Sequence, residues 1–368
     1  MIIILTQCFP SRIGGIENLM SNLALKLSDY EKVIVFADKH NISDDAIFDN
    51  YIKDKFLIRR IGGIKYFRRR KKIKELKSFL KNNNVKCIIG DTWKSFELCI
   101  DFLNSKKIPT ICLVHGNEIL KKDMGHFLKI QKILNKVNAV ICNSNYTKSL
   151  ISSFDLTKPI VKIIYPGASD YNKIKESTVY NICGNPILLT LARLEKRKGH
   201  ENILYSVKEL KNEFPNIQYV IAGSGKELIN LKKLVKELKI QKNVLFVGNV
   251  NDFQKKYLLN KTNLMIMPTL DETSKKSIEG FGISYIEASF YGVPSIASDV
   301  GGTSEAVIHD KTGIIINDIS KLHTVIRDLL LDNRKLKLLG ANAKKRAVNE
   351  FHWDIIGKQY TSLIIDLK

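Results

Sequence analysis

The chain has 368 residues, 44% of them hydrophobic, and a formal net charge of +22. This length favours two domains over one, and the apolar fraction can fill two ordinary cores. No stretch approaches the 18 or more uninterrupted apolar residues that a membrane-spanning helix needs, which argues against an integral membrane protein. The start, MIIILTQCFPSR, has no basic leader and no small-residue cleavage site, so we expect a buried strand there and not a signal peptide.

The charge leaves three classes of partner open: nucleic acid, an anionic membrane surface and phosphorylated small molecules. A lysine-rich composition without a specific partner is the alternative. The cysteines form no CxxC pair and mostly lie in apolar runs, which favours buried thiols in a reducing cytoplasm. Five of the six precede residue 150, and this distribution argues against a spaced metal site. They are Cys8, Cys87, Cys99, Cys112, Cys142 and Cys183.

In the first half of the chain, short apolar runs alternate with longer amphipathic ones. Residues 15–28 place Ile16, Leu19, Leu23 and Leu27 on one helical face. Near-continuous apolar strands separated by helices predict a parallel sheet that is covered on both faces. The strands are expected at 2–6, 33–37, 87–90, 110–115, 139–144 and 161–166.

Residues 169–186 are polar, show no clear period and end in Pro186, so we expect an irregular interdomain linker there. The alternation then restarts and predicts a second doubly wound unit. We therefore expect domains at 1–168 and 187–345. The second has expected strands at 187–193, 218–223, 244–248, 264–268, 294–298 and 312–317, and expected helices at 200–214, 226–239 and 252–260.

Informative residues are expected directly after strands, because open parallel sheets bind ligands beyond the carboxyl ends of their strands. Gly14 and Gly15 follow the first strand and open a helix, where backbone N–H groups can approach an anion. A tight turn without a ligand is the alternative. His115 ends a later strand and is well placed to face a cleft, although a single histidine is more often structural.

The second domain begins with LARLEKRKGH (191–200), which places Arg193 and Lys198 on a loop between a strand and a helix. Two cations held on one loop can bind the two phosphates of a diphosphate. Lys196 and Arg197 are interpreted as solvated. Further on, Gly223 and Gly225 provide another loop of close backbone approach.

The stretch SIEGFGISYIEA (277–288) holds two glutamates on either side of a Gly-Phe-Gly turn. We expect a helix from about Ile283, with Glu287 in its second turn and Glu279 in the loop before it. The N–H groups of Phe281, Gly282 and Ile283 then lie between the carboxylates, at the positive end of the helix dipole. Carboxylates can accept hydroxyls while amides hold a phosphate, as a nucleotide-sugar requires. Two surface glutamates near a helix start are the alternative.

The ordered combination closely resembles the retaining glycosyltransferases of family 4, which have the GT-B fold of two facing Rossmann-like domains with a cleft between them. The glutamate pair fits the family's E-x7-E element, and the matching stretches run along nearly the whole chain. These stretches are GGIE (14–17), VHG (114–116), NSNYTK (143–148), YPGASD (165–170), LARLEKRKG (191–199), AGSGKE (222–227), EGFGISYIEA (279–288), YGVPSIASDVGGTSEAV (291–307) and FHWDIIGKQY (351–360).

The resemblance implies that the N-terminal domain binds the acceptor and the C-terminal domain binds the donor. Arg193 and Lys198 would bind the donor diphosphate, Glu287 the ribose hydroxyls, and Glu279 with the amides after it the sugar. His115 would lie beside the anomeric carbon.

The resemblance also implies that the backbone of Gly15 approaches the phosphate and that the base lies near Gly223 and near Gly248 and Asn249. A final helix over 346–368 would cross back onto the first domain. The loop before Glu279 is longer than the family's common form, and YPGASD lacks the asparagine more usual before its glycine.

The implied activity is transfer of a hexose from a UDP- or GDP-sugar to a lipid-linked or saccharide acceptor in the synthesis of a cell-envelope glycan, such as lipopolysaccharide. No D-x-D motif occurs, so we expect neither a metal nor another cofactor, with Arg193 and Lys198 offsetting charge instead. A nucleotide-sugar 2-epimerase is the enzymatic alternative, but we see no set of acid and base residues for it. A nucleic-acid-binding protein would explain the charge, but it would not explain the glutamate pair. The sequence also shows no basic platform rich in aromatic residues, so nucleic acid is not expected as a partner.

One segment, 65–81, concentrates basic residues on a predicted helix whose apolar stripe is Ile73, Leu76, Phe79 and Leu80. We expect its basic side to face outward and to hold the enzyme on the anionic inner face of the cell membrane. A solvated helix face is the alternative. The basic residues are Lys65, Arg68, Arg69, Arg70, Lys71, Lys72, Lys74, Lys77 and Lys81.

Overall fold

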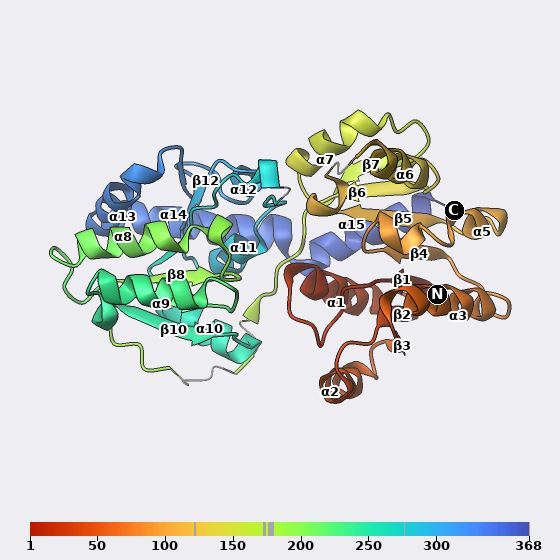
Figure 1. The fold of residues 1–368 in the computed structure, drawn as a ribbon, viewed down its shortest axis with the longest axis horizontal. Helices are drawn as coiled ribbons and strands as arrows, with labels where there is room; N and C mark the ends of the chain where they lie inside the picture. Colours follow the sequence, from red (N-terminus) through yellow and green to blue (C-terminus); the bar gives the residue numbers. More distant parts are fainter. Residues whose placement is uncertain (121–122, 172–173, 176–179, 276, 368) are drawn as a thin grey trace. The chain divides into compact units, whose positions relative to one another are not determined.

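The computed structural model describes residues 1–120, 123–171, 174–175, 180–275 and 277–367. The chain divides into two compact units: unit 1 comprises Met1–Gly167 and Trp353–Lys368, and unit 2 comprises Ala168–His352 (Figure 1). The segment 169–186, predicted to be a linker, belongs to unit 2, and its residues 172–173 and 176–179 lie outside the described part. The C-terminal helix that belongs to unit 1 begins at Trp353.

Unit 1 is built on a parallel seven-stranded sheet with the order β3-β2-β1-β4-β5-β6-β7. The inner strand β1 pairs with β2 and β4, so that Ile2 lies opposite both Val33 and Cys87. Successive β1 residues are buried in cores on opposite faces of the sheet, which explains why the strand is apolar throughout. The strands are β1 (Ile2–Leu5), β2 (Val33–Asp38), β3 (Leu57–Ile61), β4 (Cys87–Gly90), β5 (Thr110–Val114), β6 (Ala139–Cys142) and β7 (Ile160–Ile163).

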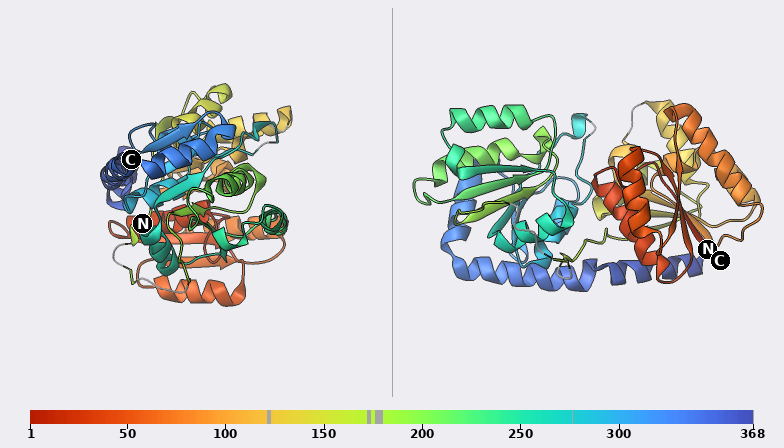
Figure 2. Two further views of the ribbon diagram at one scale, coloured as in Figure 1. Left: turned by 90° about the vertical axis from the view of Figure 1, so that its left-hand side faces the viewer. Right: turned by 90° about the horizontal axis from the view of Figure 1, so that it is seen from below.

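Helices cover both faces of this sheet (Figure 2). Ile73 and Leu76 of α3 pack in the core on one face, whereas Leu23 of α1 and Ile356 and Tyr360 of α15 pack in the core on the other. The helices of unit 1 are α1 (Gly15–Ser28), α2 (Ile42–Ile52), α3 (Lys65–Phe79), α4 (Trp93–Phe96), α5 (Ile100–Ser105), α6 (Met124–Leu134), α7 (Asn145–Ile151) and α15 (Trp353–Asp366).

Unit 2 repeats this architecture on a parallel six-stranded sheet with the order β10-β9-β8-β11-β12-β13. Its strands are β8 (Ile187–Leu191), β9 (Gln218–Ala222), β10 (Val244–Gly248), β11 (Leu264–Met267), β12 (Ser295–Ser298) and β13 (Gly313–Ile316). Its helices are α8 (His200–Leu210), α9 (Leu228–Glu237), α10 (Asp252–Lys261), α11 (Ile283–Phe290), α12 (Thr303–Ala306), α13 (Leu322–Leu331) and α14 (Asn333–Arg346), followed by a π-helical turn (Ala347–Phe351).

The predicted fold class of two Rossmann-like doubly wound domains is confirmed, but β3 and α2 were not predicted. The strand β3 is an edge strand whose sequence, LIRRI, is only partly buried, so it lacks the continuous apolar run that marked the other strands. The helix α2 exposes Ile42, Ile47 and Tyr51 while burying Asp45, so its apolar residues do not follow the buried face. Patterns based on apolar burial therefore fail at both elements.

The chain passes between the units after Gly167 and after His352. The residues on the unit 2 side of these two crossings lie side by side, because the Ala168 amide donates to the Phe351 carbonyl at 3.1 Å and Ala168 forms a parallel bridge with His352. Among the described helices, none is both long enough and apolar enough to cross a membrane.

Candidate active site

The loops after β8 and β11 in unit 2 meet in a chain of alternating charges. Glu279 Oε2 lies 2.5 Å from Lys198 Nζ and 2.6 Å from Arg197 Nη1. Glu195 continues the chain, since its carboxylate lies 3.2 Å from Arg197 Nε and 2.8 Å from Arg193 Nη1. The network holds three cations and two carboxylates, so it keeps a net positive charge next to the N-terminal end of α11.

Burial differs sharply along this network. Lys198 and Arg197 are buried, whereas the Arg193 side chain is 63% exposed. Burial alone would raise the pKa of Glu279, but the adjacent Lys198 and Arg197 lower it to about 2. Glu279 is therefore ionised at neutral pH, and Arg193 is the cation most open to an incoming anion.

The interpretation of Arg197 as a solvated residue is wrong. Its side chain is 6% exposed and bridges Glu195 and Glu279, while its carbonyl accepts from the Leu270 amide at 2.7 Å. Lys196, its neighbour, is exposed as expected. Sequence alone could not separate the two, because only the position of Glu279 decides which cation turns inward.

Glycines hold these loops against one another by close backbone contact. A Cβ atom on Gly223 or Gly225 would lie 1.9 Å from the Ala192 carbonyl oxygen or 2.4 Å from the Leu194 carbonyl oxygen, so both glycines admit the backbone around Arg193. Gly301, at φ +66°, likewise admits the Glu279 carbonyl, which accepts from the Gly302 amide at 2.9 Å.

The ends of β9 and β10 join the same region. The Gly223 amide donates to the Gly248 carbonyl at 2.7 Å, and Asn249, the next residue, is exposed. The structure thus places Gly223, Gly225, Gly248 and Asn249 at the carboxyl edge of the sheet, where they were expected.

The helix α11 begins at Ile283, as predicted, and follows Phe281 and Gly282. Glu287 lies in its second turn, with its side chain 6% exposed. Glu287 Oε1 accepts from Tyr171 Oη at 2.5 Å and from Lys255 Nζ at 3.1 Å. Neither partner was predicted, since Tyr171 lies in the expected linker and Lys255 lies on α10 among other lysines.

In unit 1, His115 follows β5 and is held by main-chain and side-chain partners. Its Nε2 atom lies 2.8 Å from the carbonyl oxygen of Asp91, and its amide donates to Glu118 Oε1 at 2.7 Å. Because a carbonyl only accepts, Nε2 carries the proton, and a neutral ring leaves Nδ1 as an acceptor.

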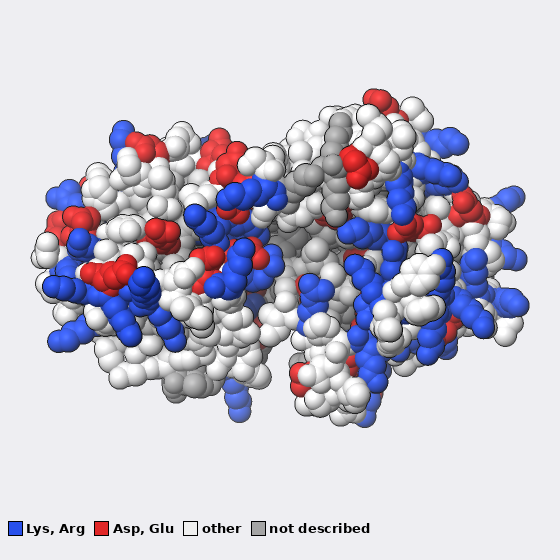
Figure 3. Space-filling view, viewed as in Figure 1, with Lys and Arg blue, Asp and Glu red and all other residues white. Residues whose placement is uncertain are grey.

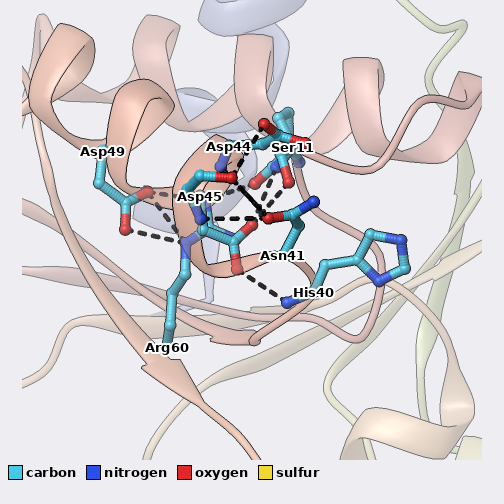
Figure 4. Close-up of polar contacts among 9 residues, drawn as sticks. Ser11, His40, Asn41, Asp44, Asp45, Asp49 and Arg60 are labelled. Atoms are coloured by element: carbon cyan, nitrogen blue, oxygen red, sulfur yellow. Dashed lines mark hydrogen bonds and ion pairs between the residues drawn. The ribbon is translucent and has the colours of Figure 1, made fainter.

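The loop between β1 and α1 is fixed by two buried carboxylates. Asp91 Oδ2 accepts from Thr6 Oγ1 at 2.8 Å and from the Gln7 amide at 2.9 Å. Asp45 accepts from the Ser11 hydroxyl at 2.7 Å and pairs with Arg60 Nη1 at 3.0 Å (Figure 4). Burial alone would raise the pKa of Asp45, but hydrogen bonds and Arg60 lower it below its usual value.

This loop leads to Gly14 and Gly15, and α1 begins at Gly15 as predicted. The Glu17 side chain fills the space beside Gly14, whereas a Cβ atom on Gly15 would meet nothing within 4 Å. Asp91 therefore contacts both His115 and the start of the loop that leads to Gly14 and Gly15. It was missed although it directly follows β4, the same edge position that singled out His115.

Two parallel-sheet units of this kind define the GT-B class of glycosyltransferases. The structure of Anabaena Alr3699/HepE in complex with UDP and glucose matches over the whole of both chains with a TM-score of 0.81 and 18% identity. The sucrose-phosphate synthase of Thermosynechococcus elongatus matches with a TM-score of 0.80 and 20% identity, covering 100% of this chain and 98% of that one.

Residues 13–170 match the family model described as Glycosyltransferase Family 4, and residues 172–346 match the one described as Glycosyl transferases group 1. Together these matches span nearly the whole chain, which belongs to these glycosyltransferase families.

Two curated relatives are mannosyltransferases. The GDP-mannose-dependent monoacylated alpha-(1-6)-phosphatidylinositol monomannoside mannosyltransferase of Corynebacterium glutamicum is 24% identical over 98% of this chain and 97% of its own length. The GDP-mannose-dependent alpha-(1-6)-phosphatidylinositol monomannoside mannosyltransferase of Mycolicibacterium smegmatis is 26% identical, and this match spans 64% of each chain.

The buried pair of Glu279 and Lys198 predicts a specific acid sensitivity. Because the pKa of Glu279 falls from 4.5 to about 2 on folding, its ionised form stabilises unit 2 above about pH 4.5. This contribution is lost as the pH falls from 4.5 toward 2. We expect Glu279→Gln to lower the unfolding temperature strongly at pH 7 and progressively less between pH 4.5 and 3, as measured by calorimetry.

Glu237→Gln, which alters a surface carboxylate of the same unit, is the matched control and should change stability little at any pH. A Glu279→Gln difference that stays constant from pH 7 to pH 3 would contradict the assignment.

Proposed function

We propose that this protein transfers a hexose from a UDP- or GDP-linked sugar to a lipid-linked or saccharide acceptor in cell-envelope glycan synthesis. The observation that carries the proposal is the convergence of Arg193, Lys198 and Glu279 at the carboxyl edge of the unit 2 sheet. This arrangement suits a diphosphate next to a polyhydroxylated group. The mannosyltransferase relatives support a sugar donor and a glycolipid acceptor as the first compounds to test.

In this proposal, Arg193 and Lys198 bind the donor diphosphate and offset the negative charge that develops on it as the glycosidic bond breaks. Within the described part of the chain, the Arg193 side chain forms an ion pair with Glu195 alone, at an exposed position. Such pairs contribute little, so exchanging Glu195 for a phosphate costs little. The ionised Glu279 accepts sugar hydroxyls. The amides at the start of α11 are proposed to hold the phosphate or sugar.

We propose retention by attack on the face from which the diphosphate departs. The bond from the anomeric carbon to the phosphate oxygen breaks, the acceptor oxygen bonds to the same carbon, and the acceptor proton passes to the departing phosphate oxygen. His115 is proposed, from the family resemblance, to lie beside the anomeric carbon and to position the reacting groups. No residue in this scheme serves as a covalent nucleophile.

The test of the proposed function is release of nucleoside diphosphate from a panel of UDP- and GDP-sugars, with and without glycolipid and oligosaccharide acceptors. We expect release that depends on the acceptor, a glycosylated product by mass spectrometry with the anomeric configuration of the donor, and unchanged rates in EDTA. Acceptor-independent release together with an epimerised sugar would instead indicate a 2-epimerase. Loss of activity in EDTA would contradict metal independence.

The roles of the two cations predict a selective loss of affinity. Arg193→Ala or Lys198→Ala should weaken binding of the nucleoside diphosphate by about 10- to 100-fold, because each removes a charge-assisted hydrogen bond. Binding of the bare nucleoside should change little. Isothermal titration calorimetry with UDP, GDP, uridine and guanosine measures both quantities.

Lys196→Ala is the matched control, since Lys196 lies on the same loop but is exposed. Equal losses of affinity for nucleoside and nucleoside diphosphate would contradict the assignment of Arg193 and Lys198 to the phosphates.

We also propose that unit 1 associates with the cytoplasmic leaflet through α3, but not through all of its basic side. Lys72 is buried and lies 2.6 Å from Asp38, which also pairs with Arg68 at 2.9 Å, and Arg69 pairs with Glu97 at 2.5 Å. These three cations form ion pairs within unit 1. The expectation that the whole basic side of the helix faces outward is therefore wrong.

The exposed part of α3 combines charge with apolar surface. Ile64, Tyr66 and Phe67 at its start are 76%, 59% and 67% exposed. Exposed cations surround them, and Lys and Arg side chains gather over α3 (Figure 3). Cations with adjacent aromatic and aliphatic side chains suit the interface of an anionic bilayer, where each cation contributes about 1 kcal/mol. The exposed cations of this segment are Lys65, Arg70, Lys71, Lys74 and Lys81.

The membrane proposal predicts sedimentation with anionic vesicles that weakens at high salt, and little with neutral vesicles. Replacing Tyr66 and Phe67 by serine should reduce binding to anionic vesicles several-fold, and so should replacing four exposed cations of α3 by glutamine. The quadruple variant is Lys65→Gln, Arg70→Gln, Lys71→Gln and Lys74→Gln.

The control is a second quadruple variant, which loses the same charge from exposed lysines of unit 2. It should sediment with anionic vesicles as the wild type does. It consists of Lys232→Gln, Lys233→Gln, Lys236→Gln and Lys242→Gln. Equal loss in both quadruple variants would show an effect of net charge only and would refute the α3 surface.

A further inference from the structure

Glu287 shares its carboxylate with two protein partners that form a closed triangle around it. Tyr171 Oη and Lys255 Nζ both donate to Glu287 Oε1, and Lys255 Nζ also lies 2.9 Å from Tyr171 Oη. The ammonium is 5.3 Å from the centre of the Tyr171 ring, over which it lies. Tyr171 is 1% exposed, so this arrangement is packed and not a surface contact.

The two oxygens of the Glu287 carboxylate are used unequally. Every hydrogen bond that the described residues make to this side chain ends on Oε1. Among the described residues no hydrogen bond ends on Oε2, and the Glu287 side chain as a whole is 6% exposed. One oxygen is thereby fixed by the protein while the other remains available to a ligand.

The charge of Lys255 determines what kind of ligand suits Oε2. Lys255 Nζ lies 3.1 Å from Glu287 and 3.9 Å from Asp252, so one ammonium offsets only part of the charge of the two carboxylates and Oε2 remains a strong acceptor. An uncharged hydroxyl donor fits such an acceptor, and a pair of adjacent hydroxyls on a ribose can use both of its lone pairs.

We propose that Tyr171 and Lys255 are positioning residues that fix Oε1 of Glu287 so that Oε2 selects the 2′-hydroxyl of a donor ribose. The inference rests on the proposed function, because it names the part of the donor that Glu287 binds. It assigns ribonucleotide specificity to two residues outside the E-x7-E element. Loss of either residue lets the carboxylate rotate and removes the discrimination between ribose and 2′-deoxyribose.

The competing explanation is that Tyr171 and Lys255 only tether the segment 168–186 to α10. The structure offers a matched control for it, because the neighbouring Lys256 donates to the Ile174 carbonyl at 2.7 Å, whereas Tyr171 and Lys255 are the described residues that hydrogen-bond to Glu287. Lys256→Met removes a tether of the same segment from the same helix, but leaves the triangle around Glu287 intact.

The experiment measures binding of UDP, dUDP, GDP and dGDP by isothermal titration calorimetry to the full chain and its variants. For whichever base binds, we expect the wild type to prefer the ribonucleotide by about tenfold or more, as one hydrogen bond to a charged group gives. Tyr171→Phe and Lys255→Met should reduce this ratio to below about threefold. Lys255→Arg and Lys256→Met should keep most of it.

The ratio of ribonucleotide to deoxyribonucleotide affinity separates a positioning role from general damage, because a loosened fold would weaken the binding of both nucleotides alike. Tyr171→Phe removes a single oxygen and decides the question if Lys255→Met does not fold. A wild type that binds none of the four nucleotides overturns the proposed function. A wild-type preference for ribose that survives unchanged in Tyr171→Phe and Lys255→Met overturns this inference alone.

Discussion

The placement of one largely buried carboxylate, Glu279, constrains the two loops that meet at the edge of unit 2. Lys198 and Arg197 are removed from water and require a partner, because breaking a buried ion pair costs about 3–5 kcal/mol. Glu195 on their own loop reaches Arg197, but Glu279 on the loop after β11 reaches both cations, so the loops after β8 and β11 must meet. The same contact explains the glycines around it, because a side chain at Gly223 or Gly301 would force the neighbouring backbones apart. The fold thus aligns cations beside a helix start before any ligand arrives.

In unit 1, buried carboxylates likewise hold loops together, by accepting hydrogen bonds from neutral groups and by pairing with an arginine. Asp91 gathers Thr6 and the Gln7 amide, while its own carbonyl holds His115, so one residue after β4 fixes the ends of two neighbouring strands. Asp45 and Arg60 then hold the next turn of the loop from its outer side. A loop of such length next to a helix start would otherwise sample many conformations, and fixing it before binding removes that entropy from the cost of recognition.

The fold and much of the candidate site could be predicted from the sequence, because strand ends are local features of the apolar pattern. Lys198 was found on the loop after such a strand, whereas Glu279 and Glu287 were found as a pair on either side of a Gly-Phe-Gly turn at the start of a helix. Their partners depend on contacts far apart in the chain: Arg197 and Lys196 are adjacent basic residues, and only the fold buries one and exposes the other. Lys72 turned inward for the same reason, since Asp38 lies beneath it at the end of β2. Pattern reasoning locates candidate residues, whereas pairing decides what each can do.

The helix α11 connects the carboxyl edge of the unit 2 sheet to the places where the chain leaves this unit. Glu287 on this helix contacts Tyr171, three residues beyond the first crossing. Phe281, directly before α11, has its ring 5.6 Å from that of Phe351, and Phe290 at its end lies 6.3 Å from the ring of His352, next to the second crossing. A packed core transmits displacement poorly by deformation and well by movement of rigid elements. Under the proposed function, a donor that binds Glu287 would therefore contact the same short helix that packs against both crossing segments.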